Sequence, residues 1–151
     1  MLRLPKKALF AIEAVLDIGY YAGVAPVQSK EITHRQGIPR RYLEQALQQL
    51  VRHGILVGVR GPRGGYRLAR ERQRITIGDI VRVVQGGGDR ASETDGMEGS
   101  ELRTKVVRPL WNEIQDMVMA HLDDLSIEDL HSEADKAGIV IEGQNALDLT
   151  I

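Results

Sequence analysis

The stretch that most constrains the fold of this chain runs from Val57 to Leu68 and is rich in glycine and arginine. Two short runs with β-propensity, Ile55 to Arg60 and Gly65 to Leu68, flank a loop whose glycines suit a reversal of direction with positive φ. A glycine loop that binds nucleotide phosphates needs a helix opening directly after it. Here a charged segment follows Leu68 instead. We therefore predict a β-hairpin that carries arginines in and beside its tip.

The net charge of −1 hides two halves of opposite sign. Residues 1–85 carry fifteen Lys and Arg and six Asp and Glu, a net charge of +9, whereas residues 86–151 carry five and fifteen, a net charge of −10. A basic module suggests a polyanionic partner, and an acidic segment is better suited to contacts with protein. The alternative is a pair of solvated surfaces that attract each other.

Composition also excludes several classes of site. The chain has no cysteine, which excludes disulfides and zinc or iron–sulfur sites held by its own thiolates.

No signal peptide opens the sequence and no run approaches about eighteen apolar residues, so a cytoplasmic protein is predicted. The four histidines are His34, His53, His121 and His131. They do not cluster with a nucleophile or at metal-ligand spacing, so no enzyme is predicted. Each histidine is expected to be a surface or capping residue.

Three helices are predicted before the hairpin. Lys6 to Ala22 has apolar residues close to helical spacing. Ser29 to Gly37 is expected to form a short helix with Ser29 as its N-cap, and Arg40 to His53 forms a longer one with a buried stripe and a polar outer face. A short helix, a tight turn and a second helix with such a face are typical of a helix-turn-helix.

The polar face of the helix from Arg40 to His53 has the chemistry of a major-groove recognition helix. Arginine matches the acceptors of guanine, glutamine pairs with adenine, and glutamate accepts from the amino group of cytosine. Tyr42 can touch a phosphate through its hydroxyl or pack its ring into the core, and we favour a combination of the two. The predicted major-groove residues are Arg40, Arg41, Tyr42, Glu44, Gln45 and Gln48.

A hairpin directly after a helix-turn-helix completes the order of a winged helix. Arginines at its tip can enter a narrow minor groove or bind the phosphates along it. The predicted wing residues are Arg60, Gly61, Pro62, Arg63, Gly64, Gly65, Tyr66 and Arg67. Lysines on an opening helical turn oppose the helix dipole, so an external phosphate would favour them there. The predicted phosphate contacts are Lys6, Lys7, Ser29, Lys30 and Arg52.

Three separated blocks of the sequence occur in a characteristic order and spacing. They are Tyr42-Leu-Glu-Gln45 with Gly54-Ile-Leu, Val59-Arg-Gly-Pro-Arg-Gly-Gly-Tyr-Arg-Leu68, and Ile75-Thr-Ile-Gly-Asp-Ile80. Together these blocks resemble the Rrf2 family of bacterial transcription regulators. The resemblance covers residues 1 to about 135. It implies a homodimeric winged-helix regulator that binds a pseudo-palindromic operator, with a long C-terminal helix forming the dimer. It also implies recognition and wing roles for Arg41, Tyr42, Glu44, Gln45, Arg60 and the loop from Gly61 to Tyr66.

The segment after the winged helix departs from the family. A helix from Ile77 to Gln85, capped by Thr76, is expected to close the DNA-binding domain, and residues 86–105 to form a flexible loop. Family members that sense iron, nitric oxide or redox state carry three cluster-ligating cysteines in this loop. The matching positions here fall near Glu93, Gly99 and Lys105, so no cluster and no cofactor are predicted. A less favoured alternative is a hard metal ion held by loop carboxylates, from Asp89, Glu93, Asp95, Glu98 and Glu101.

An apolar stripe runs through the last third of the chain. Pro109 indicates that the ordered helix either begins between Val106 and Arg108 or bends there. Ser126 is expected to cap a short helix that stops at Gly138. Because an isolated stripe needs a partner surface, we predict a two-fold homodimer. The predicted interface residues are Leu102, Val106, Leu110, Trp111, Ile114, Met117, Val118, Leu122 and Leu125.

The sequence thus predicts a mainly α fold with a small β-hairpin. The expected divisions are a winged helix-turn-helix domain at 1–85, a loop at 86–105, a dimerisation helix with a short following helix at 106–137, and a tail at 138–151. The protein is predicted to be a sequence-specific transcription regulator that binds operator DNA as a homodimer, and a repressor is favoured over an activator. The alternative is a winged-helix adaptor that binds protein and not DNA. An unknown small effector, a protein partner or no effector are all open, and no membrane contact is expected.

Overall fold

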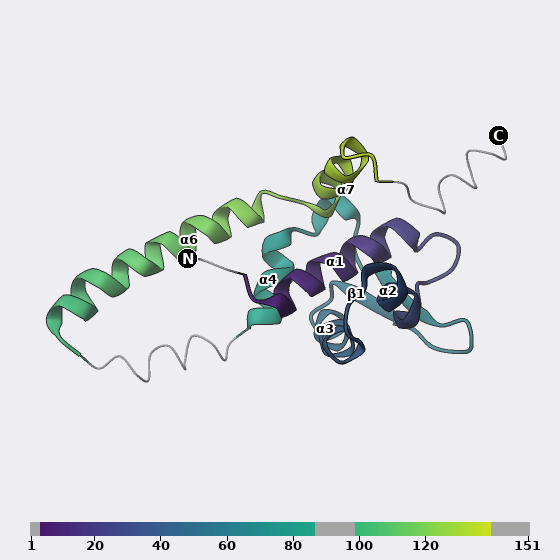
Figure 1. The fold of residues 1–151 in the computed structure, drawn as a ribbon, viewed down its shortest axis with the longest axis horizontal. Coiled ribbons are helices and arrows are strands. Elements are labelled where there is room, and N and C mark those ends of the chain that lie inside the picture. Colours follow the sequence, from purple (N-terminus) through teal and green to yellow (C-terminus); the bar gives the residue numbers. More distant parts are fainter. Residues whose placement is uncertain (1–3, 87–98, 140–151) are drawn as a thin grey trace.

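The computed structural model describes residues 4–86 and 99–139. Helices dominate these residues, and one two-stranded hairpin accompanies them, as the sequence predicts (Figure 1). The elements in chain order are α1 (Lys6–Tyr21), α2 (Ser29–Gln36), α3 (Arg40–Arg52), β1 (Leu56–Val59), β2 (Gly65–Leu68), the 3-10 turn η1 (Arg72–Arg74), α4 (Ile77–Gln85), the π-helical turn η2 (Arg103–Val107), α6 (Arg108–Asp123) and α7 (Ile127–Lys136).

Helix α1 lies at the centre of the core and packs against α2, α3, α4, α7 and β2. Three alanines on α1 are fully buried, and their small side chains let neighbouring helices approach its backbone. Around them the core is built from branched aliphatic side chains, among them Ile18, Ile32, Leu43, Leu47, Leu50, Ile80 and Ile127. Removing this much apolar surface from water is the main driving force for the fold.

Two helix caps in the first half of the chain show where local signals succeed and fail. Gly37 ends α2 in the left-handed conformation with φ 66°, as predicted. Ser29 is not the N-cap of this helix: Gln28 holds that position, and its backbone N–H donates to the carboxylate of Glu31 at 2.9 Å. The prediction for Ser29 was therefore wrong by one residue, because Glu31 selects the cap three residues before it.

The hairpin has the predicted antiparallel arrangement, with Leu56 opposite Leu68 and Val59 opposite Gly65. An unpredicted bridge joins it to the segment before α2, since Val27 and Tyr66 exchange backbone hydrogen bonds of 3.0 and 2.7 Å. Of the loop glycines only Gly61 has a positive φ, at 112°. Gly64 and Gly65 are needed for another reason: a Cβ would collide with the carbonyl oxygens of Val59 and Val27, respectively. The general expectation of positive φ was wrong for these two.

The second half of the chain is joined to the winged helix at the starts of α4 and α7, among other contacts. Thr76 caps α4 and Ser126 caps α7, as predicted. In each cap the aspartate three residues later accepts a hydrogen bond from the backbone N–H of the capping residue. The two caps lie side by side, because the N–H of Ile77 donates to the carbonyl of Leu125 at 2.8 Å and that of Ile127 to Ile75 at 2.9 Å. The start of α4 and the turn between α6 and α7 therefore form one hydrogen-bonded junction.

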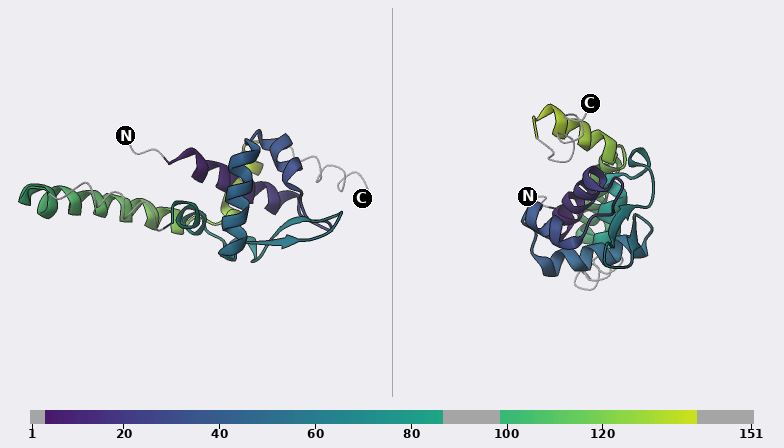
Figure 2. Two further views of the ribbon diagram at one scale, coloured as in Figure 1. Left: turned by 90° about the horizontal axis from the view of Figure 1, so that it is seen from below. Right: turned by 90° about the vertical axis from the view of Figure 1, so that its right-hand side faces the viewer.

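From this junction α6 extends away from the rest of the molecule as an arm (Figures 1 and 2). Helical structure begins at residue 101, before Pro109, so of the two alternatives a first helical residue between Val106 and Arg108 was wrong, although the regular α-helix α6 begins at Arg108. The π-helical turn precedes the proline, and the N–H of Arg108 donates to the carbonyl of Arg103, five residues back. This wide turn accommodates the proline ring without ending the helix. Residues 101–105, expected in the loop, belong to the arm.

Helix α7 folds back onto α1 through a buried histidine. His131 is 3% exposed, so the expectation of a surface or capping histidine was wrong here. Its Nε2 donates to the carbonyl of Leu16 at 3.0 Å, and its Nδ1 accepts from Arg72 at 3.2 Å. The ring stacks on Tyr20 with centroids 3.8 Å apart. Burial lowers the pKa of His131 below its ordinary value, which favours the neutral ring that these partners require.

Candidate nucleic-acid interface

The recognition-helix candidate α3 is divided sharply into a buried and an exposed side. Leu43, Ala46, Leu47 and Leu50 are buried in the core. Because successive helical residues are about 100° apart, the side opposite this stripe is centred on a line of four polar residues: Arg41, Gln45, Gln48 and Arg52. All four are exposed. Of the predicted DNA-binding residues, these four face outward most directly.

Two other predicted major-groove residues, Arg40 and Glu44, pair with each other on the flank of α3. The Nε of Arg40 donates to the carboxylate of Glu44 at 2.9 Å, and both side chains are exposed. Such an exposed pair contributes little to stability. Both groups are therefore available to bases, and the arginine reduces the repulsion between the glutamate and a polyanion.

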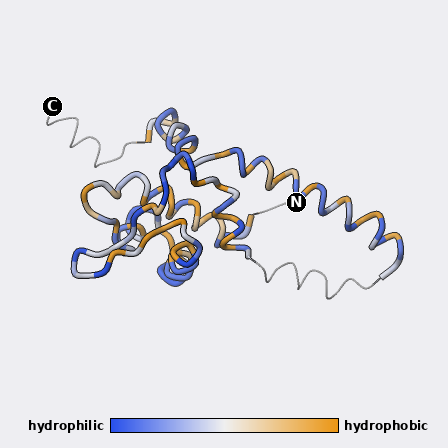
Figure 3. The backbone as a smooth tube through the Cα atoms, turned by 180° about the vertical axis from the view of Figure 1, so that it is seen from behind, coloured by the Kyte–Doolittle hydropathy of each residue, from blue (hydrophilic) through white to orange (hydrophobic). Residues whose placement is uncertain are grey.

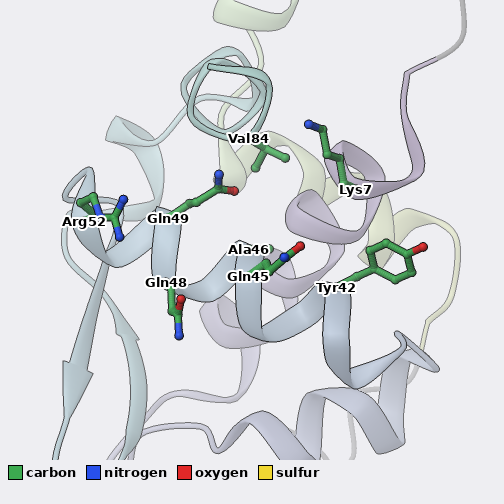
Figure 4. A pocket seen from close by; sticks show the side chains of 8 residues that line it. All are labelled: Lys7, Tyr42, Gln45, Ala46, Gln48, Gln49, Arg52 and Val84. Carbon is green, nitrogen blue, oxygen red and sulfur yellow. The ribbon is translucent and has the colours of Figure 1, made fainter. Parts of the chain in front are cut away.

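Tyr42 occupies the mixed position that the sequence favoured. Its ring lies 5.9 Å from that of Phe10, centroid to centroid, while 43% of the residue is exposed. The ring thus contacts α1, and the rest of the side chain lines an open groove beside α3. Figure 4 shows this groove, which we call the α3 groove; it has a volume of about 350 Å³ and is lined by Lys7, Tyr42, Gln45, Ala46, Gln48, Gln49, Arg52 and Val84.

The part of the chain that the structure describes contributes two cationic side chains and no carboxylate to the lining of the α3 groove. Lys7 comes from the first turn of α1, which has no acidic residue. Gln49, on the polar face of the predicted helix but outside the predicted set of site residues, adds an amide donor from α3. The signal for it was weak, because a half-buried glutamine on an amphipathic helix is common. Lys6 and Lys30 are also exposed, and Ser29 is partly exposed, so the predicted phosphate contacts are accessible.

The wing arginines have different environments. Arg60 and Arg63 are exposed on either side of the turn at Gly61 and Pro62. Arg67, in contrast, donates to the carbonyl oxygens of Gly23 at 2.6 Å and Val24 at 2.7 Å. Its guanidinium fixes the hairpin to the loop between α1 and α2. The structure therefore gives Arg67 a structural contact, whereas Arg60 and Arg63 have no ion-pair partner among residues 4–86 and 99–139.

The arm presents most of the predicted dimer residues to solvent. Figure 3 shows hydrophobic segments recurring along it, and α6 has no buried residue. The exposed members of the predicted set are Leu102, Val106, Leu110, Trp111, Met117 and Val118. Ile114 is half-buried, whereas Leu122 and Leu125 pack against the core of their own chain. The last two thus contribute to the junction with α4, and the unpartnered stripe ends before them.

Metal ligands are not gathered anywhere in residues 4–86 and 99–139: these ranges contain no group of three or more His, Asp or Glu placed to hold an ion. The carboxylate alternative rests on residues 89–98, which lie outside the described residues, and on Glu101, which pairs with Lys105 at 3.1 Å. Within the same described ranges, no helix is long and apolar enough to cross a membrane.

Comparison with known proteins gives one consistent answer. The sequence profile of the Rrf2 family, described as an iron-dependent transcriptional regulator, matches residues 4–133. The HTH-type transcriptional regulator IscR of Sodalis glossinidius (strain morsitans) is 32% identical over 145 residues, which cover 95% of this chain and 87% of that protein. IscR of Aliivibrio salmonicida (strain LFI1238) is 34% identical over 130 residues, which cover 85% of this chain and 77% of that protein.

Solved structures agree with this result. The structure of T. potens IscR superposes with a TM-score of 0.74 at 29% identity and covers 95% of this chain and 96% of that one. CymR, the global cysteine regulator of B. subtilis, superposes with a TM-score of 0.70 at 32% identity and covers 88% of this chain and 98% of that one. The family description implies iron. The residues of this chain do not fit an iron–sulfur cluster held by thiolates, because the chain has no cysteine.

Proposed function

Because this chain belongs to the Rrf2 family of transcription regulators, we propose that it binds a pseudo-palindromic operator as a homodimer and represses transcription without a cysteine-ligated cluster. Members of this family are DNA-binding regulators and not enzymes. The observation that carries the proposal is the combination of an outward-facing polar line on α3 with exposed arginines on the hairpin that follows it. We place this activity in the cytoplasm, where such regulators meet their operators.

The two elements suit different parts of a duplex. Helix α3 would enter the major groove, where Arg41 can bind guanine and Gln45 and Gln48 can bind adenine. Glu44, held by Arg40, can accept from cytosine. Arg60 and Arg63 would enter the adjacent minor groove or contact its phosphates. Lys7 and Arg52, across the α3 groove, would contact the backbone and so fix the position of the helix.

The dimer is proposed on the exposure of the arm. Leu102 is 65% exposed, Leu110 57% and Met117 66%, which leaves a row of large apolar side chains in water. A second copy of the arm, related by a two-fold axis, would cover this row with an identical one. It would also supply the second α3 for a half-site about 34 Å away.

The absence of cysteine supports regulation by something other than a cluster. A small effector or a protein partner could supply the signal, and binding without any effector is the third possibility. The matched test is DNA binding before and after incubation with an iron chelator and with an oxidant, which we expect to leave the affinity unchanged. An affinity that changes after chelation would contradict this part of the proposal.

DNA binding is tested by fluorescence anisotropy on a selected operator and on a random duplex at several salt concentrations. Arg60→Ala or Arg63→Ala should weaken binding by about 1–3 kcal/mol and reduce the salt slope by roughly one. Glu44→Ala or Gln45→Ala should mainly change the preferred bases. Lys136→Ala, a cation on α7 remote from these elements, is the control. Equal losses on both duplexes for all four variants would contradict the assignment, and the absence of any salt slope would favour a protein-binding adaptor.

Dimer formation is tested by sedimentation of Leu110→Glu, which places a charge in the exposed row. We expect a monomer with weak operator binding, because each half-site then binds independently. Asn112→Glu, which places the same charge at an exposed position on the opposite side of the helix, is the control. A Leu110→Glu chain that still sediments as a dimer would show that the interface lies elsewhere.

A further inference from the structure

A hollow separates the last turn of α3 from the hairpin. We call it the wing hollow; it has a volume of about 400 Å³ and is lined by Val51, Gly58, Val59, Arg60, Gly65 and Tyr66. In the strand register Gly58 lies opposite Tyr66. Leu56 and Leu68, two residues further along the same face of the ribbon, pack against the core. The Gly58 position therefore belongs to the face that turns toward the domain.

The hollow exists because residue 58 has no side chain. A Cβ built at Gly58 meets no heavy atom within 4 Å, so neither crowding nor close packing requires glycine here. Its φ is not positive, so backbone conformation does not require it either. Glycine weakens the interior of a strand, and where it occurs there it often marks a site at which another backbone approaches closely. The space at Gly58 is suited to such an approach.

The lining of the hollow indicates which chemistry would fill it. Val51 and Val59 are 36% and 39% exposed, so both side chains offer apolar carbon at the hollow. Among the described residues that line the hollow, Arg60 is the only charged one. An occupant with apolar carbon along its sides and a negative charge at one point would match this surface. A deoxyribose followed by its phosphate has these properties.

The position of the hollow supports the same occupant. Helix α3 lies on one side of it and the hairpin on the other. If these elements enter a major groove and the adjacent minor groove, the strand that separates the two grooves has to pass between them. We propose that the wing hollow binds the sugar–phosphate backbone of this strand, with its sugars against Val51 and Val59 and a phosphate at Arg60. This inference rests on the proposed function and adds the binding site for that backbone segment.

The test fills the hollow without disturbing the fold. Gly58→Val adds a branched side chain in open space, and valine favours strands, so the melting temperature should be equal to or above that of the natural chain. We expect at least tenfold weaker binding, equally on operator and random duplex, and a smaller loss for Gly58→Ala. Val57→Ile adds volume on the same strand at a residue that does not line the hollow, and this variant should bind normally. Ethylation of the phosphates between the two grooves should interfere with binding by the natural chain.

The outcomes separate this inference from the proposed function. If the natural chain binds DNA and a folded Gly58→Val chain binds equally well, the inference is wrong and the proposed function stands. A loss restricted to the operator would also overturn it, because the hollow would then read a base. If the natural chain shows no affinity for any duplex, the proposed function fails first.

Discussion

An ion pair between α1 and α2 determines how the helix-turn-helix is fixed to the domain. The side chain of Asp17 is fully buried, whereas that of Arg35 is 24% exposed. The guanidinium donates from Nε and Nη2 to the two carboxylate oxygens at 2.9 and 2.7 Å, and Gln36 adds a third donor at 2.9 Å. The hydrogen bonds to Asp17 raise the pKa of Arg35 above its ordinary value, so the guanidinium stays charged. We predict that Arg35→Ala strongly destabilises the protein.

The magnitude follows from what remains after the substitution. Asp17 would keep only the Gln36 donor for a carboxylate that has no access to water. Removing one partner of a buried pair costs about 3–5 kcal/mol, a large share of a typical stability of about 5–15 kcal/mol. For a chain of this length such a loss lowers the melting temperature by roughly 6–20 °C. The same variant should weaken DNA binding, because α2 supports α3.

Urea unfolding followed by far-ultraviolet circular dichroism measures this loss at fixed protein concentration. The matched control is Arg82→Ala, since Arg82 makes a similar two-pronged pair with Asp123 on the surface. The control should cost much less than Arg35→Ala, because water replaces its partner. Asp17→Ala combined with Arg35→Ala should be no worse than Arg35→Ala alone, since no unpaired charge is left. Equal costs for the two arginines would refute the argument from burial.

Three further substitutions test other contacts. Burial lowers the pKa of His131, so at low pH the unfolded chain binds a proton that the folded chain does not; the free energy of unfolding should therefore be highest above about pH 6.5 and fall below it. The melting temperature of His131→Gln should depend less on pH, and a pH dependence equal to that of the natural chain would contradict this argument. Gly65→Ala should break the bridge to Val27 and loosen the wing, seen as faster amide exchange at Val27. Ile127→Ala, at a fully buried position, should cost about 2–5 kcal/mol in urea unfolding, and a cost below 1 would show that α7 is not part of the core.

The features that the sequence predicted correctly depend on neighbours along the chain. Thr76 and Asp79 are three residues apart, as are Ser126 and Asp129, and each pair forms its reciprocal cap as expected. The buried stripe of α3 follows from helical spacing alone. The hairpin was predictable because two short strand-like runs flank one glycine-rich turn. Helix-turn-helix and wing were therefore recognisable before any tertiary contact was known.

The features that were missed depend on residues far apart in the sequence. Asp17 and Arg35 each look like ordinary surface charges, and His131 contacts Leu16 across 115 residues. Arg67 resembles the other wing arginines, and only its contact with the loop after α1 distinguishes it. No local pattern contains these pairings, because polar side chains are usually exposed unless a partner meets them in the folded chain.

The π-helical turn before Pro109 reconciles two signals that conflicted in the sequence. Apolar residues at Leu102, Val106 and Leu110 are four apart, and each step of four advances around an ideal α-helix by about 40° more than one turn. A stripe with this spacing therefore winds around the helix and turns away from a straight partner helix. A π-helical turn contains an extra residue and takes up part of this drift, while its wider ring accommodates the proline. The proline and the spacing of the stripe thus favour the same local structure.

The junction at the root of the arm links this stripe to the spacing of the two recognition helices in the proposed dimer. The arm is attached to the winged helix by the paired caps of α4 and α7 and by Arg82, which donates to Asp123 at 2.7 Å. Gly78 allows Asp123 to approach, since a Cβ there would collide with its carboxylate. Within each protomer these contacts fix the angle between α6 and α3. In the proposed dimer the partner arm would then determine the distance between half-sites, so a substitution such as Gly78→Ala should reduce operator binding while non-specific binding persists. Unchanged discrimination between operator and random duplex in that variant would show that the junction does not control half-site spacing.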